Sequence, residues 1–155
     1  MMQISTKTEY GLRCLRRLAR QPEQGALSIT GIAQMEHVPK HYAQQILMRL
    51  RRAGLVKSIR GTGGGFALAQ TAEAISVGQV VRVLEGAPFE DTCDHFNKKS
   101  DCGHLENCSI RPIWQTISRR LWESLDHIHL RQLVDDEKTV EQKLEVDLPA
   151  LRFPV

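Results

Sequence analysis

The sequence predicts a mainly α-helical protein with a small β-hairpin wing, that is, a winged helix-turn-helix followed by a long dimerisation helix. Apolar residues recur at helical spacing through residues 6–53, and two short β-like runs then flank a glycine-rich turn. A second long amphipathic stretch begins near residue 110. We expect a winged domain over residues 1–72, a cysteine-rich and dimerisation region over 73–134, and a polar tail over 135–155.

The composition is that of a soluble globular protein. Of 155 residues, 41% are apolar and 25% are charged. The N-terminus has no apolar signal core, and no apolar run reaches the roughly 18 residues that span a bilayer. We therefore expect a cytoplasmic protein that does not contact a membrane and whose thiols stay reduced.

The positive and negative charges are divided between the two halves of the chain. Residues 1–70 contain eleven Lys and Arg against three Asp and Glu, whereas residues 71–155 contain ten against fifteen. A solvated surface would distribute the two signs more evenly. The asymmetry favours a polyanion, such as nucleic acid, as the partner of the N-terminal half.

The first expected helix runs from Thr6 to about Gln21. Its opening residues "TKTE" are typical of a capping box, in which Thr6 caps the helix and Glu9 reaches back. An apolar stripe follows at helical spacing: Gly11, Leu12, Cys14, Leu15, Leu18 and Ala19. We expect Cys14, on this stripe, to be a buried structural thiol.

Two further helices and a hairpin complete the predicted winged domain. Ser28 caps the short helix "SITGIAQME", "HVP" turns the chain, and a third helix follows from Pro39 to Ala53, where Gly54 stops it. Its expected inward residues are Ile46, Leu47 and Leu50, and its outward residues are His41, Gln44, Arg49, Arg51 and Arg52. The runs "VKSIR" and "GFALA" around "GTGG" predict the hairpin. The glycine run lacks the Lys-Ser/Thr of a phosphate-binding loop.

The C-terminal half predicts two more helices. The segment "ISVGQVVRVLEG" indicates a helix from Ser76 to Leu84. From Ile110 a near-heptad apolar stripe follows: Ile110, Trp114, Ile117, Leu121, Leu125 and Ile128. A small winged domain cannot bury this stripe, so we expect a second copy to cover it. The tail after Val134 shows no strong pattern.

The order of these blocks resembles the Rrf2 family of bacterial transcription regulators over about residues 2–134. The resemblance rests on "STKTEYGLRCLRRLA", "KHYAQQILMRLRRAGLVKSIRGTGGGFALA", "ISVGQVVRVLEG", and three cysteines before a long helix. The opening "KTEYGLRCL" is closer to the nitric-oxide-sensing branch than to the iron–sulfur biogenesis branch. The resemblance implies a homodimer that binds a palindromic operator in double-stranded DNA, usually as a repressor.

The expected DNA contacts lie on the third helix and on the wing. Near the N-terminus of this recognition helix are Lys40, His41, Tyr42 and Gln44. Gln can contact adenine, although Gln44 could also be a solvated amide and Tyr42 could pack inside. In the family, an arginine at the position of Arg60 enters the minor groove. We expect Arg52 and Lys57 to contact phosphate. Gly64, in the glycine-rich turn of the wing, is the last of the expected DNA-binding residues.

Three cysteines, Cys93, Cys102 and Cys108, suggest a bound cofactor. Their C-x8-C-x5-C spacing is wider than zinc sites favour, and a reducing compartment disfavours disulfides. Three thiolates suit an iron–sulfur cluster of two or four irons. Zinc, bound with the help of His95 or His104, remains an alternative.

The resemblance also suggests a fourth ligand. In the nitric-oxide branch a carboxylate on the first helix reaches across from the other subunit, and the matching residue is Glu9, with His104 as second choice. The biogenesis branch uses a histidine where this chain has Arg111, which is a poor ligand. The expected function is a DNA-binding regulator, not an enzyme, that senses redox, nitric oxide or iron status. The alternative is the same regulator without a cluster, sensing thiol redox state, a metabolite or a partner.

Overall fold

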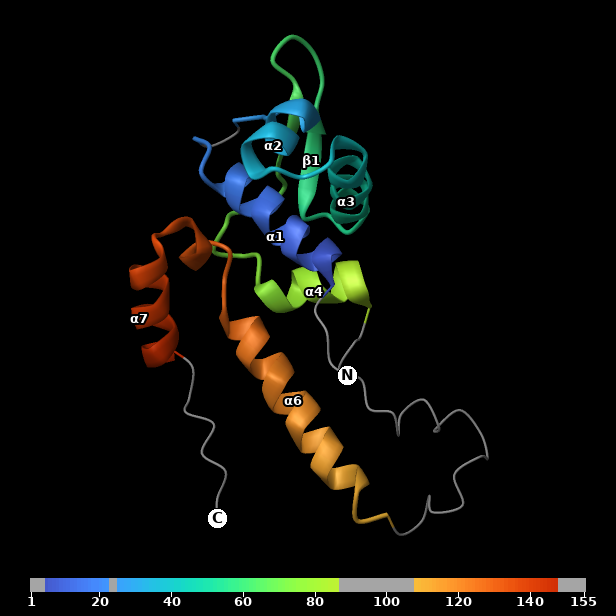
Figure 1. Ribbon diagram of the computed structural model, residues 1–155, viewed down its shortest axis with the longest axis vertical. Helices are drawn as coiled ribbons and strands as arrows, with labels where there is room; N and C mark the ends of the chain where they lie inside the picture. Colours follow the sequence, from blue (N-terminus) through green and yellow to red (C-terminus); the bar gives the residue numbers. More distant parts are fainter. Residues whose placement is uncertain (1–4, 23–24, 87–107, 148–155) are drawn as a thin grey trace, which may run out of the picture.

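The predicted class, mainly helical with one antiparallel hairpin, is confirmed. The computed structural model describes residues 5–22, 25–86 and 108–147. The elements in chain order are α1 (Thr6–Ala19), α2 (Ile29–Glu36), α3 (Lys40–Arg52), β1 (Val56–Ile59), β2 (Gly65–Leu68), α4 (Val77–Glu85), α6 (Arg111–His127), the 3-10 turn η1 (Gln132–Val134) and α7 (Glu137–Asp147) (Figure 1). None of the helices within these ranges has the length and apolar character needed to cross a bilayer.

The first three helices and the hairpin enclose one apolar core. Cys14, Leu15 and Leu18 of α1 are buried against the inward face of α3, where Ile46, Leu47 and Leu50 are also buried, as predicted. The Ser28 side chain accepts the Gly31 N–H at 3.0 Å and caps α2, which confirms that prediction too. This packing fixes the outward face of α3.

The predicted capping box at the start of α1 is wrong. Ser5 occupies the N-cap position without a side-chain cap, and Glu9 forms an ion pair with Arg13 one turn later. The hydroxyls of Ser5 and Thr8 donate instead to Glu85 at the end of α4. The side chains at the start of α1 therefore pair with a carboxylate that is distant in sequence, and not with Glu9.

A buried carboxylate joins α1 to α2. Glu36, whose side chain is 3% exposed, accepts from Arg16 at 3.1 Å and from Arg17 at 2.6 Å. The next residue, His37, has φ of 53° and turns the chain in a left-handed conformation toward α3. The ion pairs therefore hold the end of α2 just where the helix-turn-helix bends.

The wing is anchored at its base by a third backbone segment. Strands β1 and β2 pair with Val56 opposite Leu68, and Phe66 also exchanges two hydrogen bonds with Leu27, the residue before the α2 cap. A Cβ on Gly65 would lie 2.1 Å from the Leu27 carbonyl oxygen. Only glycine therefore allows the wing to approach α2 this closely.

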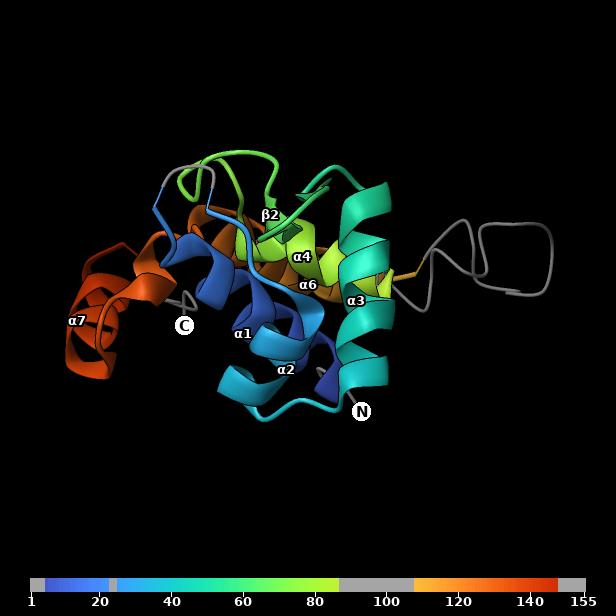
Figure 2. The same cartoon turned by 90° about the horizontal axis from the view of Figure 1, so that it is seen from above.

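Helix α4 lies between α1 and α6 and connects the winged part of the molecule to the long helix (Figures 1 and 2). It begins with a capping box formed by Ser76 and Gln79. Arg82 on α4 donates to both carboxylate oxygens of Asp126, at 2.6 and 2.7 Å, and lies over the ring of Trp122. These contacts fix the direction in which α6 leaves the winged part.

The apolar stripe of α6 is covered over only half of its length. Leu121, Leu125 and Ile128 pack against α4. Toward the other end of the helix, Ile110, Ile113, Trp114 and Ile117 are 58%, 58%, 51% and 37% exposed. Nothing in the described part of the chain covers this second half.

The C-terminal segment contains a helix, α7, that the sequence pattern does not predict. Helix α7 begins after Asp136, whose carboxylate accepts the N–H and the hydroxyl of Thr139 at 3.1 and 2.9 Å. The Asp-x-x-Thr spacing was a usable capping signal, hidden by the weak apolar pattern that follows.

Candidate nucleic-acid interface and thiol sites

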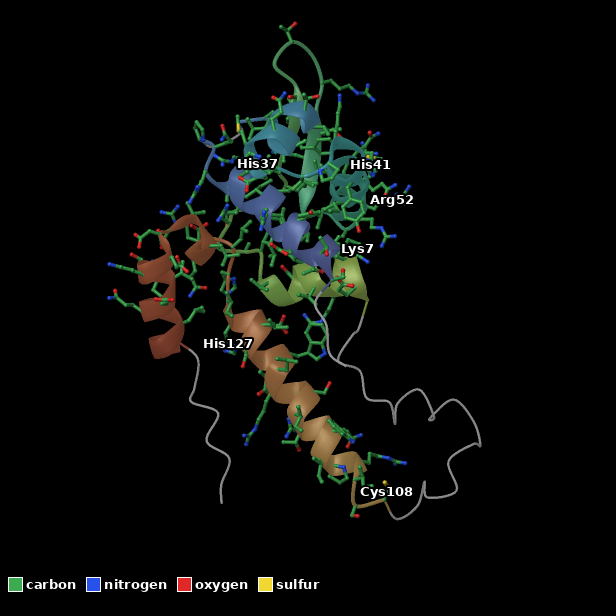
Figure 3. All side chains as sticks on the ribbon, viewed as in Figure 1. Lys7, His37, His41, Arg52, Cys108 and His127 are labelled. Carbon is green, nitrogen blue, oxygen red and sulfur yellow. The ribbon has the colours of Figure 1, made fainter. Side chains whose placement is uncertain are left out.

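One exposed face of α3 gathers the polar residues expected to contact bases. His41 and Gln44 are exposed on its first turns and Arg52 near its end, and Figure 3 shows His41 and Arg52 on the side of α3 away from α2. Gln45 is exposed next to Gln44 and was not predicted, although its spacing of four from His41 places it on the same face. Lys40, also exposed, opens the helix.

Tyr42 does not share this exposed face. Its ring is partly buried and meets the ring of Tyr10 on α1 edge-on, with centroids 5.8 Å apart and planes at 87°. This arrangement supports the alternative in which Tyr42 packs inside. Tyr42 therefore holds the start of α3 against α1.

The cations of the N-terminal half fall into two groups. Those of α1 have partners: Lys7 lies near Glu85, Arg13 near Glu9, Arg16 and Arg17 at Glu36, while Arg20 donates to the Val134 carbonyl. Within the described ranges, no acidic side chain forms an ion pair with any cation of α3 or the wing, namely Lys40, Arg49, Arg51, Arg52, Lys57 and Arg60. The uncompensated positive charge is therefore concentrated on α3 and the hairpin.

The hairpin side chains point to different sides. Arg51 on α3 donates to Ser58 on β1 at 2.9 Å, so this face of the hairpin adjoins the recognition helix. Lys57 lies on the other face, where it lines a surface cavity together with Gln70 and Glu73. Arg60 is exposed at the start of the wing turn. At Gly64 a Cβ would lie 2.4 Å from the Ile59 carbonyl oxygen, so the turn itself requires glycine.

The two described cysteines have opposite environments. Cys14 is fully buried, and burial, with a smaller contribution from Glu36, raises the pKa of its thiol to about 12. Cys108 is partly exposed just before α6, where the backbone N–H groups of Arg111 and Ile110 lower the pKa of its thiol (Figure 3). Cys14 is thus an inert structural thiol, as predicted, whereas the pKa of Cys108 is shifted toward easier formation of the thiolate.

These environments predict a difference in alkylation. In metal-free, reduced protein at pH 8, iodoacetamide should modify Cys108 and leave Cys14 unmodified until the protein unfolds, because only the thiolate attacks and Cys14 is both protonated and buried. The raised pKa also means that neutral Cys14 stabilises the fold below the ordinary thiol pKa and that this contribution is lost at strongly alkaline pH. Peptide mass spectrometry would locate the label. Equal labelling of both thiols in folded protein would contradict the assignment.

Of the predicted metal ligands, the structure describes only Glu9 and Cys108, and it does not bring these two together within one chain. Cys93, Cys102, His95 and His104 lie outside the described residues. Glu9 is exposed on α1, where it lines a cavity with Leu12 of the same helix and Val140 of α7, whereas Cys108 lies at the far end of α6 (Figure 3). Within the described ranges, no three His, Cys, Asp or Glu side chains are arranged to hold a metal ion.

Comparison with known proteins shows which proteins this chain is similar to in sequence. The model of the Rrf2 family, described as an iron-dependent transcriptional regulator, matches residues 4–136. The transcriptional regulator CymR of Bacillus subtilis is 39% identical over 134 residues, which cover 85% of this chain and 89% of CymR. IscR of Vibrio cholerae, also named as a transcriptional regulator, is 29% identical over 147 residues, covering 95% and 83%.

A solved structure supports the same assignment. The structure titled as that of CymR, the global cysteine regulator of B. subtilis, superposes with a TM-score of 0.69 and 36% identity, covering 86% of this chain and 97% of the other. The similarity of this chain to CymR in structure and in sequence confirms the predicted winged-helix class and the predicted family resemblance. The chain is similar to proteins named as transcriptional regulators of the helix-turn-helix type.

Proposed function

The chain belongs to the Rrf2 family of DNA-binding transcription regulators, and we propose that it acts as a homodimeric repressor whose affinity for a palindromic operator depends on an iron–sulfur cluster. The observation that supports DNA contact most directly is the uncompensated positive charge on α3 and the hairpin. The phosphates of a polyanion would supply the negative charges that the described part of the chain does not place beside these cations. The signal sensed would be redox, nitric oxide or iron status.

Within this proposal α3 lies in the major groove. His41, Gln44 and Gln45 present hydrogen-bonding groups to base edges, and Arg52 at the other end of α3 contacts phosphate. Arg60 contacts the minor groove from the wing. Lys57, on the opposite face of the hairpin from Ser58, contacts phosphate only if the backbone passes that side of the wing.

This assignment separates two kinds of variant. Gln44→Ala should cost about 1–3 kcal/mol of discrimination at one operator base pair and leave binding to unrelated DNA unchanged. Arg52→Ala should weaken binding to all sequences by a similar factor and reduce its salt dependence. Arg119→Ala, which removes the same charge from α6, is the matched control and should leave the affinity unchanged. Fluorescence anisotropy on operator and scrambled duplexes would measure all three. Equal losses for Gln44→Ala on both duplexes would contradict base contact.

The exposed half of the α6 stripe supports the homodimer. Four large apolar side chains in succession on one helix are too costly to leave in water, and a second copy covers them symmetrically. A two-fold dimer then offers two α3 helices to two operator half-sites. The chain division into residues 1–72, 73–134 and 135–155 is kept in this proposal, with α7 in the last segment.

The two proposed ligands that the structure describes, Cys108 and Glu9, have the chemistry needed to bind an iron–sulfur cluster. Cys108 is partly exposed and its pKa is lowered, which eases formation of the thiolate, the form that binds iron. Glu9 is exposed, is not needed as a helix cap, and pairs only with Arg13 in the described part of the chain. We assign Cys93, Cys102, Cys108 and the partner subunit's Glu9 as ligands, with His104 as the alternative fourth. The cluster would supply a group that nitric oxide or oxygen attacks.

The ligand set predicts distinct outcomes for two variants. Anaerobically purified protein should absorb in the visible through sulfur-to-iron charge transfer, and replacing Cys93, Cys102 and Cys108 by Ala together should abolish that absorbance. Glu9→Gln should leave it present but short-lived, because an anionic ligand is lost while helix α1, which Glu9 does not cap, is unaffected. Absorbance decay after exposure to air measures the lifetime. A colourless, zinc-containing wild type, or an unchanged lifetime in Glu9→Gln, would reject the respective assignment.

A second candidate, a regulator that senses thiol redox state without a cluster, is supported by two observations. The pKa of the partly exposed Cys108 is lowered, and a relative is titled the global cysteine regulator of its organism. In that case operator affinity should change with oxidant in metal-free protein. In the cluster proposal, metal-free protein has an affinity that oxidant does not change.

A further inference from the structure

The first turn of α1 is held by a carboxylate from the end of α4. Thr8 donates its hydroxyl to Oε1 of Glu85 at 2.6 Å, and Ser5 donates to the same oxygen. The Lys7 ammonium lies 3.7 Å from Oε2, and Figure 3 shows Lys7 beside the end of α4. The Ser5 side chain does not cap α1, and it contacts Glu85 together with the Thr8 side chain.

This contact is charged and shielded from water. Thr8 is fully buried and the Glu85 side chain is 13% exposed. Burial alone would raise the pKa of Glu85, but the hydrogen bonds from Ser5 and Thr8 and the charge of Lys7 hold that pKa below its usual value. The carboxylate also lies at the positive end of the α1 dipole. Charge-assisted hydrogen bonds in such a setting are strong.

The contact joins two segments that the proposed function treats separately. Glu9 follows Thr8 directly on α1. Glu85 is the last residue of α4, and Cys93 lies eight residues further along the sequence. Helix α4 in turn packs on α6, whose exposed apolar face is the proposed dimer surface. Glu85 therefore links the place of Glu9 to the helix that faces the second subunit.

We propose that Glu85 is a positioning residue that fixes Glu9 relative to α4 and α6, so that Glu9 reaches the cysteines of the partner subunit. The inference rests on the proposed function, because Glu9 needs a fixed place only if it is a ligand. Without Glu85 the hydroxyls of Ser5 and of the buried Thr8 lose their acceptor, and the first turn of α1 loosens. Glu9, within that turn, then loses its defined position while the buried core of α1 is retained.

The test compares Glu85→Ala with Glu73→Ala, which removes an exposed carboxylate that lies 3.8 Å from Arg131. In metal-free protein, hydrogen exchange of the amides of residues 6–10 should become at least roughly tenfold faster in Glu85→Ala, because the two hydrogen bonds from Ser5 and Thr8 to a charged group are lost. Glu73→Ala should leave it unchanged. In anaerobically assembled protein the cluster absorbance should decay faster in Glu85→Ala, and Glu85→Gln, which keeps an acceptor oxygen, should be intermediate.

Unchanged exchange at residues 6–10 overturns the clamp. Faster exchange with an unchanged cluster lifetime shows that Glu85 only stabilises the fold, which overturns the positioning role. A wild type that assembles no cluster overturns the proposed function itself and the positioning role with it, and this is seen before any variant is compared.

Discussion

Replacing Trp114 and Ile117 by Glu should convert the protein to a monomer and lower its operator affinity by at least about 100-fold. Both side chains belong to the exposed half of the α6 stripe. Two like charges on each subunit would oppose pairing of this face with its copy. A monomer has one recognition helix, so it loses the effective concentration that joins two half-site contacts, typically 10²–10⁴ in affinity.

Light scattering after gel filtration would give the mass, and anisotropy on the full operator would give the affinity. Gln115→Glu is the matched control, because it adds a negative charge to the same helix on a different ridge, and it should stay dimeric. The fold should survive in the double variant, since neither side chain is buried in the described part of one chain. A double variant that remains a dimer with wild-type affinity would show that α6 does not mediate pairing.

Glu36→Ala should lower the free energy of unfolding by about 3 kcal/mol, since removing one partner of a buried ion pair leaves the others uncompensated. Glu36 is almost fully buried between Arg16 and Arg17, both of which are only partly exposed. The change also detaches the end of α2 from α1 at the bend of the helix-turn-helix. Operator affinity should therefore fall together with stability.

Urea unfolding of metal-free protein would measure the loss, and Glu36→Gln should be intermediate because its amide oxygen still accepts from arginine. Glu123→Ala is the control: its ion pair with Arg119 is exposed and spans 4.0 Å, and such pairs contribute less than about 1 kcal/mol. If the two alanine variants unfold at the same urea concentration, the buried triad does not stabilise the fold.

The elements that could be predicted from the sequence are those whose signals are local. Ser28 caps the helix that it precedes, Gly54 (φ 74°) follows the end of α3, and the inward residues of α3 follow from their spacing. The helix was correctly predicted to begin at Thr6, but its capping box was mispredicted, because the carboxylate that the Ser5 side chain contacts, Glu85, is 80 residues away. No local pattern can show that a distant carboxylate is already present at a helix terminus.

The same limit applies to the candidate site. The exposure of His41 and Gln44 followed from periodicity, and Gln45 could have been found by extending it. The hydrogen bond from Arg51 to Ser58 shows which face of the hairpin adjoins α3, and Lys57, the neighbouring residue on the strand, lies on the opposite face. The charge of Lys57 alone does not reveal this orientation. The cysteine spacing predicts thiolate ligands, but the proposed fourth ligand would depend on how two chains meet. That geometry is a property of the pair.

Two glycines allow α4 to approach both of its neighbouring helices closely. A Cβ on Gly11 would lie 2.3 Å from the Leu84 side chain, and one on Gly78 would lie 2.0 Å from the Asp126 carboxylate, so at each helix contact a side chain packs directly against the backbone of a glycine. Because these contacts couple α4 to both neighbours, we expect the winged part and α6 to turn together in the proposed dimer. In the proposed dimer, a small rotation between the two α6 helices would become a much larger displacement at each α3. Regulation would then act on the distance between the half-sites that the two subunits can span, while each recognition helix keeps its own shape and chemistry.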